Sequence, residues 1–565
     1  MTSHRSRISP EARHALIVGA IALLLSSLPY LAGFAAQTPD QVFDGAVFDL
    51  PDYHTHLGEM QLGRRGEWLH RILSTSEEHP GALMRTFYIA LGHLARLSDW
   101  PLPLVYQLAR VVFGALLLLA AYRFIAALTD RPEVRRAAFL LVAFSSGLGW
   151  LVQIAAPAGP DGISPIDFWL IDANTFFSIL IFPHFSAAIA LLLEIQTRLA
   201  AALGHASHAP GRREGAVVAL CALLLTSIHP YAIALVLGPA VVFAAWQVIR
   251  RRGLPRRWWG LLVAALLGAA PVLVYSGVVF LAEPAFRQWA AQNHTPSPPP
   301  SYYVLGYGLV LALALAGARR FVRERGEAAA FVLTWPVIVA ALVYVPIGIQ
   351  RRFVEGVHVP LCVVAAYGLV GLSGRVSARA RFALVTFTLA IASLSNLYLV
   401  VGHTTAAGTR SQAIFHAADL IAAIDWLGAH STWRDTVLAA ESTGSLIPAR
   451  IGHRVVLGHW AETFAYDDRR RDVAAFFDAA TPDAARLDAL RRLGVRFVVR
   501  GAAERALGGF DPAQVDYLRE VYQSGEVAVY RVEIATLRFA VGIFDEDADF
   551  EGFSVERRIW SHAPA

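Results

Sequence analysis

Acidic residues gather in two polar segments that each adjoin a long apolar run. Asp49 and Asp52 follow the first apolar run of the chain, and Asp167 and Asp172 lie in the next comparable segment. If the two segments meet, these carboxylates could bind Mg²⁺ or Mn²⁺ through oxygen ligands, or one of them could act as a general base. Solvated loop acids are the ordinary alternative for any single one, but the grouping favours a site.

Histidines accompany these acids. His54 and His56 follow Asp52 closely, which is weak evidence for zinc because two histidines one residue apart in a loop are a poor ligand set. Glu78 and His79 come later in the same segment and are further candidates for binding a substrate. His184 lies at the edge of another apolar run, where a hydrogen-bonded packing role is the alternative to binding.

Arginines supply the opposite charge. Arg351 and Arg352 follow an apolar run directly, and Arg110 lies just inside another. A guanidinium is a planar fork that suits phosphate oxygens, and a charge within a membrane segment is a functional hypothesis by default. The alternative for Arg351 and Arg352 is contact with anionic lipid headgroups, and for Arg110 it is the same contact or an ion pair with a loop acid.

The composition shows what must position these residues. Of the 565 residues, 56% are hydrophobic and 16% are charged, which departs from soluble proteins in the membrane direction. A membrane-spanning helix needs about 20 apolar residues. The sequence predicts eleven such segments, at 15–34, 104–128, 137–155, 176–193, 216–228, 231–249, 258–281, 302–316, 328–347, 357–372 and 382–401. We therefore predict an all-α polytopic transmembrane bundle.

One stretch needs a turn to fit this scheme. Residues 215–249 would form a helix of about 50 Å at 1.5 Å per residue, longer than the hydrocarbon core of about 30 Å. Arginines flank the stretch on both sides, and His229-Pro230 is the natural apex because proline breaks the helical hydrogen bonds. The first arm is short, so a re-entrant hairpin is an alternative to two full spans.

The arginines also predict an orientation. Twenty of them fall in the short loops on one side of the predicted bundle and three in the short loops on the other, which places the rich side in the cytoplasm. The N-terminus is then cytoplasmic and the C-terminal region extracytoplasmic, in a multi-pass protein of the plasma membrane. The first apolar run is too long for a typical signal peptide, so we expect it to be retained.

The predicted organisation has three parts. Residues 1–401 form the transmembrane domain, with a large first outer loop at 35–103; residues 402–540 form an extracytoplasmic α/β domain; and 541–565 form a tail. In the α/β domain, strands are expected at 436–440, 454–457, 495–499 and 527–532 and helices at 468–477 and 482–493.

The composition excludes some chemistries. All 49 basic residues are arginines, so a lysine Schiff base and a Walker lysine are excluded. The sequence has no dinucleotide-binding or Walker pattern, and we expect no nucleotide cofactor. Cys221 and Cys362 lie in apolar runs, where they are expected to pack as small hydrophobic residues.

Outward acids and an outward arginine pair favour group transfer from a lipid phosphate. A carboxylate would accept the proton of the acceptor hydroxyl, and the arginines or a cation would stabilise the departing phosphate. Two other classes remain open. A lipid or glycan flippase would move substrate across vesicles without a covalent product, and an envelope assembly partner would have no activity of its own.

Several motifs together resemble the GT-C superfamily of integral-membrane glycosyltransferases, in the uncharacterised bacterial branch related to the polyprenyl-phosphate-dependent mannosyl and arabinosyl transferases. Their order along the predicted topology is more specific than any one of them. They are Asp52-Tyr53, Gly66-Glu67-Trp68-Leu69, Ser76-Glu77-Glu78-His79-Pro80-Gly81, Tyr88, Leu91-Gly92-His93-Leu94-Ala95-Arg96, Leu108-Ala109-Arg110, Asp172-Ala173-Asn174-Thr175-Phe176, Phe182-Pro183-His184-Phe185, Gln350-Arg351-Arg352-Phe353, Gly356, Pro360-Leu361 and Gly458-His459-Trp460-Ala461-Glu462-Thr463.

The resemblance implies a polyprenyl-phosphate-linked sugar donor, an extracytoplasmic glycan, lipid or protein acceptor, and inversion at the anomeric carbon. Membrane lipids are implied partners and nucleic acid is not. Asp52 would be the base, Asp167 or Asp172 would help to hold a cation or the acceptor, and Arg351 or Arg352 would meet the phosphate. The first loop has Asp49-x-x-Asp52 in place of Asp-x-Asp, which leaves the choice between Asp49 and Asp52 open.

Overall fold

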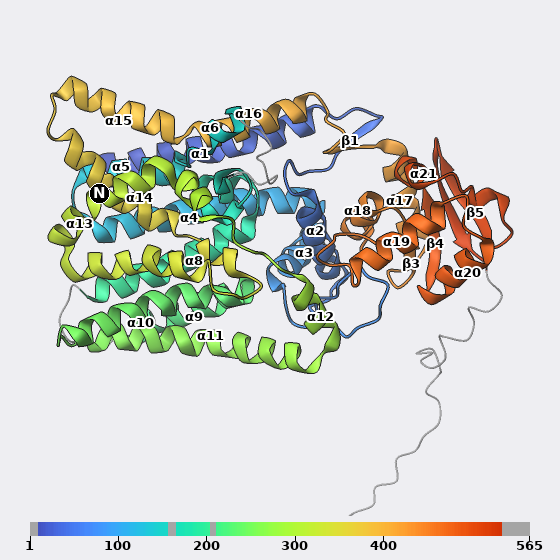
Figure 1. The fold of residues 1–565 in the computed structure, drawn as a ribbon, viewed down its shortest axis with the longest axis horizontal. Coiled ribbons are helices and arrows are strands. Elements are labelled where there is room, and N and C mark those ends of the chain that lie inside the picture. Colours follow the sequence, from blue (N-terminus) through green and yellow to red (C-terminus); the bar gives the residue numbers. More distant parts are fainter. Residues whose placement is uncertain (1–8, 156–164, 204–210, 534–565) are drawn as a thin grey trace, which may run out of the picture.

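A helical bundle and a C-terminal region with a small sheet lie at opposite ends of the molecule (Figure 1). The structure is a computed structural model, and it describes residues 9–155, 165–203 and 211–533. The predicted tail at 541–565 lies outside the described residues, as does the end of the predicted α/β domain.

Long apolar segments form the helices of the bundle, because a helix satisfies its own backbone hydrogen bonds where no water is available. These helices are α1 (Pro10–Ala35), α4 (Leu102–Leu128), α5 (Pro132–Phe144), α6 (Gly149–Ala155), α7 (Thr175–Leu180), α8 (Pro183–Ala202), α9 (Arg212–Ile228), α10 (Ala234–Ile249), α11 (Arg256–Ala282), α13 (Pro300–Leu342), α14 (His358–Ser373), α15 (Ala378–Ala392) and α16 (Leu394–Gly408).

Each of the eleven predicted segments coincides with one or more of these helices. In the described residues, eight helical segments are long and apolar enough to cross a membrane, or nine if the bent pair α15 and α16 is one span. The difference has two sources. Helix α9 has only 17 residues. Helix α13 is interrupted at Gly326 and its two ends meet, with the rings of Tyr303 and Tyr344 6.1 Å apart, so that it contains two of the predicted segments.

The chain reverses at His229-Pro230, as predicted. Helix α9 ends at Ile228, the short 3₁₀ helix η3 (Pro230–Ile233) makes the turn, and α10 runs back. An ion pair of 2.7 Å between Arg257 and Glu214 then places the start of α11 beside the start of α9. The two arms are therefore antiparallel.

The end of the bundle away from the C-terminal region carries many inter-helix ion pairs, and we call it the arginine end. Arg131 pairs with Glu324 at 3.1 Å, and Arg252 pairs with Glu327 at the same distance. The opposite end, which we call the domain end, faces the C-terminal region and carries the segment between α1 and α4. The described loops predicted to be cytoplasmic and those predicted to be outer thus lie at different ends.

At the domain end, α2 (Leu50–Arg65) crosses α3 (Thr86–Ser98) very closely. A side chain at Gly63 of α2 would overlap the carbonyl oxygen of Ile89, and one at Gly92 of α3 would overlap that of Met60. Two glycines at one crossing let the backbones touch and fix the position of α2. Helix α12 (Pro284–Gln292) follows α11 at the same end.

A two-stranded ladder connects the first loop to the C-terminal region. Strand β1 (Gln41–Phe43) pairs antiparallel with β2 (Phe415–Ala417), in a register that places Val42 opposite His416. Segments more than 370 positions apart in the sequence are therefore joined directly.

The rest of the C-terminal region is a mixed sheet with helices on both faces. Its strand order is β3-β4-β6-β5, with β3 parallel to β4 and the other pairs antiparallel. Alternate residues of β4 face opposite sides: Phe497 and Val499 join one apolar cluster, and Val498 joins the other. The elements are α17 (Ala418–His430), β3 (Thr436–Leu438), α18 (Glu441–Ile451), α19 (Tyr466–Phe477), α20 (Asp483–Arg492), β4 (Val495–Arg500), α21 (Ala502–Leu507), η5 (Pro512–Gln514), β5 (Leu518–Ser524) and β6 (Val527–Val532).

The predicted alternation of strands and helices is present, with one correction. Residues 454–457 form no named strand; Val455 makes a single bridge to Val437. Strand β5 and helices α17, α18 and α21 were not predicted. Strand β5 (Leu518–Ser524) is the edge strand of the described sheet, and edge strands often carry polar residues. These polar residues hid the strand pattern in the sequence.

Candidate active site

The N-terminus of α2 presents two carboxylates. Asp49 precedes the helix with a φ of 49°, which turns the chain into the first turn, and its side chain caps no backbone N–H. Asp52 lies within that first turn. The partial positive charge at a helix N-terminus favours ionised carboxylates, so both groups are placed where a negative charge is tolerated.

Asp52 contacts a histidine from the C-terminal region. Nε2 of His459 lies 3.4 Å from Oδ1 of Asp52. Burial acts to raise the pKa of Asp52, but the charges of His459, His56 and Arg352 outweigh it and hold that pKa below its usual value. About a third of the Asp52 side chain (32%) remains exposed. An ionised, accessible carboxylate at this position is available to accept a proton as a general base.

Asp49 behaves in the opposite way. Burial, together with the negative charge of Asp52, raises the pKa of Asp49 to about 7, although Arg352 acts against the shift. Two neighbouring carboxyl groups do not both ionise readily, and the proton stays on Asp49, whose charge has fewer cations to stabilise it than that of Asp52. Near neutral pH, Asp52 is therefore the ionised member of the pair.

The two arginines lie on a short 3₁₀ helix, η4 (Gln350–Val354), just before α14. Arg351 stacks over the ring of Trp169 at 5.1 Å, and Arg352 stacks over Phe185 at 5.6 Å. The nearest charges acting on Arg352 include Asp172, Asp52 and Asp49. Within the described residues neither arginine forms an ion pair at 4.0 Å or less, so both guanidinium forks stay available for an anion.

Asp172 joins this group from the second predicted loop. It lies in η2 (Ile171–Ala173) and is almost completely buried. Neither carboxylate oxygen has a hydrogen-bond partner among the described residues. Burial raises the pKa of Asp172 to about 6, with Arg352 opposing and Glu355 adding to the shift. A buried carboxylate with two unpaired oxygens beside an arginine is typical of a binding site rather than of a core.

Histidines form one side of the site, and sequence reasoning did not identify most of them as a set. His229 and Glu355 form a buried pair at 2.9 Å. The hydroxyl of Tyr88 lies 2.6 Å from Nδ1 of His184. The ring of His184 is 5.0 Å from that of His56. Of these, His184 was predicted; His229 was read only as a turn, and Glu355 offered no signal besides its place after the arginine pair.

A series of charged side chains connects the site to the C-terminal region. Arg85 pairs with Glu59 of α2 at 3.3 Å and with Glu462 at 3.1 Å. The indole N–H of Trp289 in α12 donates to Glu462 at 3.1 Å. Because Glu462 is three residues from His459, these contacts hold the histidine against Asp52. Burial raises the pKa of Glu462 to about 7, although Arg85 opposes the shift.

Arg110, a predicted substrate-binding residue, lies inside the helical bundle. It is fully buried and donates to the carbonyl oxygens of Ser26 and Ile179, at 3.2 and 3.1 Å. Its guanidinium also lies over the ring of Tyr30 at 4.3 Å. All of these contacts join helices of the bundle, and a role of Arg110 in binding substrate stays a prediction.

Glu78 and His79 are also not brought to the site. The side chain of Glu78 is 89% exposed and lies 3.7 Å from Arg454. His79 folds back on its own loop, where its Nε2 accepts from the N–H of Ile72 at 3.2 Å. Both residues therefore shape the surface of the loop.

The contacts of Asp167 differ from those of Asp172. Its Oδ2 accepts from the backbone N–H groups of Gly147 and Gly149, at 3.2 and 3.1 Å, and so fixes the turn into α6. Across the described residues, only Asp44, His54 and His416 form a group of three ligand-type side chains close enough to hold a metal ion. Asp167 and Asp172, the predicted ligands of Mg²⁺ or Mn²⁺, belong to no such group among the described residues, and their metal site stays a prediction.

Comparisons with known proteins give structural neighbours alone. No family model matches the chain, and no curated protein matches its sequence. Three solved structures are similar. The oligosaccharyltransferase of Archaeoglobus fulgidus has 16% identity and a TM-score of 0.50, over 86% of this chain and 69% of its own. ArnT of Cupriavidus metallidurans, bound to undecaprenyl phosphate, has 12% identity and a TM-score of 0.52, over 92% of this chain and 98% of its own. The arabinofuranosyltransferase AftD from Mycobacteria has 16% identity and a TM-score of 0.55, over 92% of this chain and 40% of its own.

Proposed function

The chain has the GT-C fold of integral-membrane glycosyltransferases, and we propose that it transfers a sugar from a polyprenyl-phosphate donor to an extracytoplasmic acceptor. One observation carries the proposal. Asp49 and Asp52 of the first loop, Asp172 of the second and Arg352 are electrostatic neighbours at the domain end of the bundle. The binding of undecaprenyl phosphate by ArnT supports the class of donor.

In the proposed reaction, Asp52 accepts the proton of the acceptor hydroxyl. The hydroxyl oxygen attacks the anomeric carbon from the face opposite the phosphate, which inverts the configuration. His459 holds the Asp52 carboxylate in place, and the ionisation state of Asp49 sets how basic that carboxylate is. A positioned general base contributes typically about 10²–10⁴-fold to rate.

The bond between the anomeric carbon and the phosphate oxygen breaks as the new bond forms, and its electron pair stays on the phosphate. Arg352, with Arg351 beside it, stabilises that charge through guanidinium groups that make no ion pair with any described residue. The polyprenyl chain of the donor would remain among the apolar helices. No step requires a nucleotide or a metal ion.

The test uses the full chain in lipid nanodiscs, supplied with undecaprenyl-phosphate-linked hexoses or pentoses and an envelope glycan fraction. Release of undecaprenyl phosphate is followed by mass spectrometry. We expect release by the wild type and a loss of at least about 10²-fold in Asp52→Asn, because the amide has no basic oxygen at neutral pH. Asp488→Asn is the matched control, since the side chain of Asp488 is 78% exposed on α20.

Full activity in Asp52→Asn would reject the assignment of the base. Movement of the lipid between leaflets without release of undecaprenyl phosphate would favour the flippase alternative. Inactivity of the purified chain with every donor of this class would favour the assembly partner.

A further inference from the structure

Three side chains away from the arginine pair form a compact cluster of metal-ligand type. Asp44 follows β1, His54 lies on α2, and His416 lies on β2. Nε2 of His54 is 2.7 Å from Oδ2 of Asp44, and Nε2 of His416 is 3.4 Å from the same oxygen. The side chains of Asp44 and His54 are 4% and 6% exposed. All three ligand-type atoms lie within 4.8 Å of one another.

The backbone holds this cluster in position. The β1–β2 ladder carries His416 to the first loop, where the N–H of Asp44 donates to the carbonyl oxygen of Ile414 at 3.0 Å. The hydroxyl of Tyr53 donates to the carbonyl oxygen of Asp44 at 3.3 Å. Ligands from three segments are thus placed before any ion arrives.

The ligand set indicates the class of metal. Two imidazoles and one carboxylate are a common zinc set, whereas Mg²⁺ and Ca²⁺ prefer oxygen ligands only. Zn²⁺ bonds of about 2.0–2.1 Å in tetrahedral geometry separate neighbouring ligand atoms by about 3.3 Å. The measured separations of 2.7 and 3.4 Å lie on either side of that value, so a small opening of the His54–Asp44 contact would admit the ion.

Hydrogen bonding alone does not account for the cluster. Among the described residues, Nε2 of His416 is buried and makes no well-formed hydrogen bond, although it lies 3.4 Å from Oδ2 of Asp44. Nδ1 of His54 is also buried and has no hydrogen-bond partner in the described part of the chain. A nitrogen that points at a carboxylate without bonding to it is expected where an ion would lie between them.

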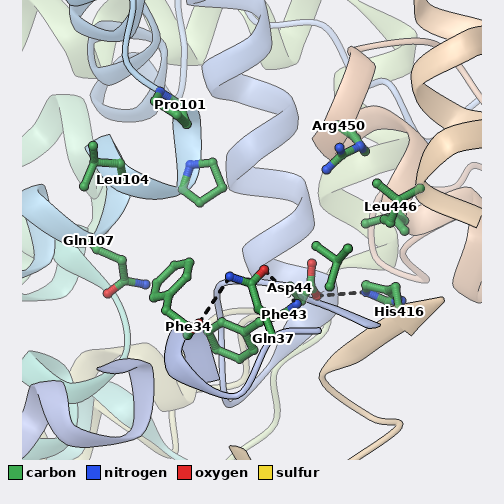
Figure 2. A pocket seen from close by; sticks show the side chains of 13 residues that line it. Phe34, Gln37, Phe43, Asp44, Pro101, Leu104, Gln107, His416, Leu446 and Arg450 are labelled. Atoms are coloured by element: carbon green, nitrogen blue, oxygen red, sulfur yellow. Dashed lines mark hydrogen bonds and ion pairs between the residues drawn. The ribbon is translucent and has the colours of Figure 1, made fainter. Parts of the chain in front are cut away.

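A pocket borders the cluster and leaves room for a fourth ligand. It has a volume of about 380 Å³, and its lining includes Asp44, His416 and Gln107. Figure 2 shows the Asp44 carboxylate directed toward the His416 ring at the edge of this pocket. Three protein ligands leave the fourth tetrahedral position of a zinc ion open to a water molecule.

We propose that Asp44, His54 and His416 bind one divalent transition-metal ion, Zn²⁺ in the first instance, which fastens the first loop and α2 to the C-terminal region. His54 is two residues beyond Asp52 on the same helix, so the ion positions the N-terminus of α2. The inference of a metal site does not rest on the proposed sugar transfer, although the ion would hold the helix that carries Asp52.

The test uses the full chain, purified with a tag that contains no histidine, stripped with a chelator and then titrated with Zn²⁺. We expect one equivalent of zinc by elemental analysis and a rise in the temperature of thermal unfolding. Co²⁺ in place of Zn²⁺ should give the visible absorption of a tetrahedral site. These readouts do not depend on enzymatic activity, so they can fail or succeed separately from the proposed function.

His416→Ala should weaken zinc binding by at least about 100-fold, given that even outer groups around a metal site contribute 10–100-fold. His430→Ala is the matched control, because His430 is exposed on α17 and stacks on Trp426. A wild-type chain that retains no zinc would overturn the proposal. Zinc binding that is unchanged in His416→Ala would also overturn it, by placing the ion at another histidine group. If His416→Ala does not fold, zinc content and the cobalt spectrum of the wild type still decide.

Discussion

At the scale of single residues, Arg352 is the residue proposed to stabilise the departing phosphate. It stacks on Phe185, lies among three carboxylates and forms no ion pair at 4.0 Å or less with any described residue. A guanidinium that is packed on an aromatic ring and not consumed by a partner is preorganised for a phosphate.

Arg352→Gln should lower kcat/KM for the polyprenyl-phosphate donor by about 10²–10³-fold, the range found when a donor to a developing negative charge is removed. Steady-state kinetics in nanodiscs provide the measurement. Arg471→Gln is the control, since that side chain is 74% exposed on α19. Equal kinetics for the two variants would remove Arg352 from the mechanism.

The raised pKa of Asp49 predicts that kcat/KM depends on pH. Below about pH 7 Asp49 is protonated, and Asp52 is a weak base because His459 and Arg352 stabilise its charge. As Asp49 ionises, its charge destabilises the Asp52 carboxylate and makes it more basic. We therefore expect kcat/KM to rise with pH through about 7.

The Asp49→Asn variant isolates this effect. It cannot ionise, so the rise through about pH 7 should disappear while activity itself remains. A wild-type profile that is flat between pH 6 and 8, or an unchanged rise in Asp49→Asn, contradicts the assignment of the shared proton to Asp49.

The packing of helix α2 against its neighbours, more than its own helix propensity, determines where the Asp49 and Asp52 carboxylates lie. Helix α2 has a mixed polar sequence that gave no helical signal, and it was expected only as part of a loop. Its position comes from the close crossing with α3 and from contact with α18. A methyl group added at Gly58 of α2 would lie 3.6 Å from Pro448 of α18. Such long-range contacts leave no trace in the local pattern of the sequence.

Gly63→Ala tests this crossing. The new methyl group would overlap the carbonyl oxygen of Ile89, and overpacking of this kind costs about 1–3 kcal/mol. We expect a lower temperature of unfolding and reduced transfer activity, because Asp52 is carried by the displaced helix. Gly402→Ala in α16 is the control, since a methyl group there meets no atom within 4 Å. Equal unfolding temperatures for the two variants would refute this account of how α2 is held.

For the whole molecule, the apolar runs predicted the bundle well because burial in lipid constrains every residue of a span. The sequence placed Asp52, Asp172 and Arg352 near helix ends on one predicted side, and in the structure the two carboxylates act electrostatically on Arg352. The sequence did not predict that Arg110 and Asp167 bond to the backbone, since a buried residue of this kind has the same sequence signature as a binding residue. His459 was noted only by resemblance, because nothing local predicts that a residue about 400 positions away will contact Asp52.

The predicted orientation of the whole molecule can be tested with single cysteines. Both native cysteines are buried, so a new one on the surface can be read selectively. Asp488→Cys in the C-terminal region should react with an impermeant maleimide in intact cells, and Gly253→Cys at the arginine end should react only after permeabilisation. The reverse pattern would invert the topology and place the site on the cytoplasmic side.

A structure of the chain with undecaprenyl phosphate in nanodiscs tests the central claim most directly. The account predicts phosphate density in contact with the guanidinium groups of Arg351 and Arg352, with the Asp52 carboxylate facing the position that the sugar would occupy. Phosphate density at another part of the bundle, with the arginine pair still stacked on Trp169 and Phe185 and free of ligand, would contradict it.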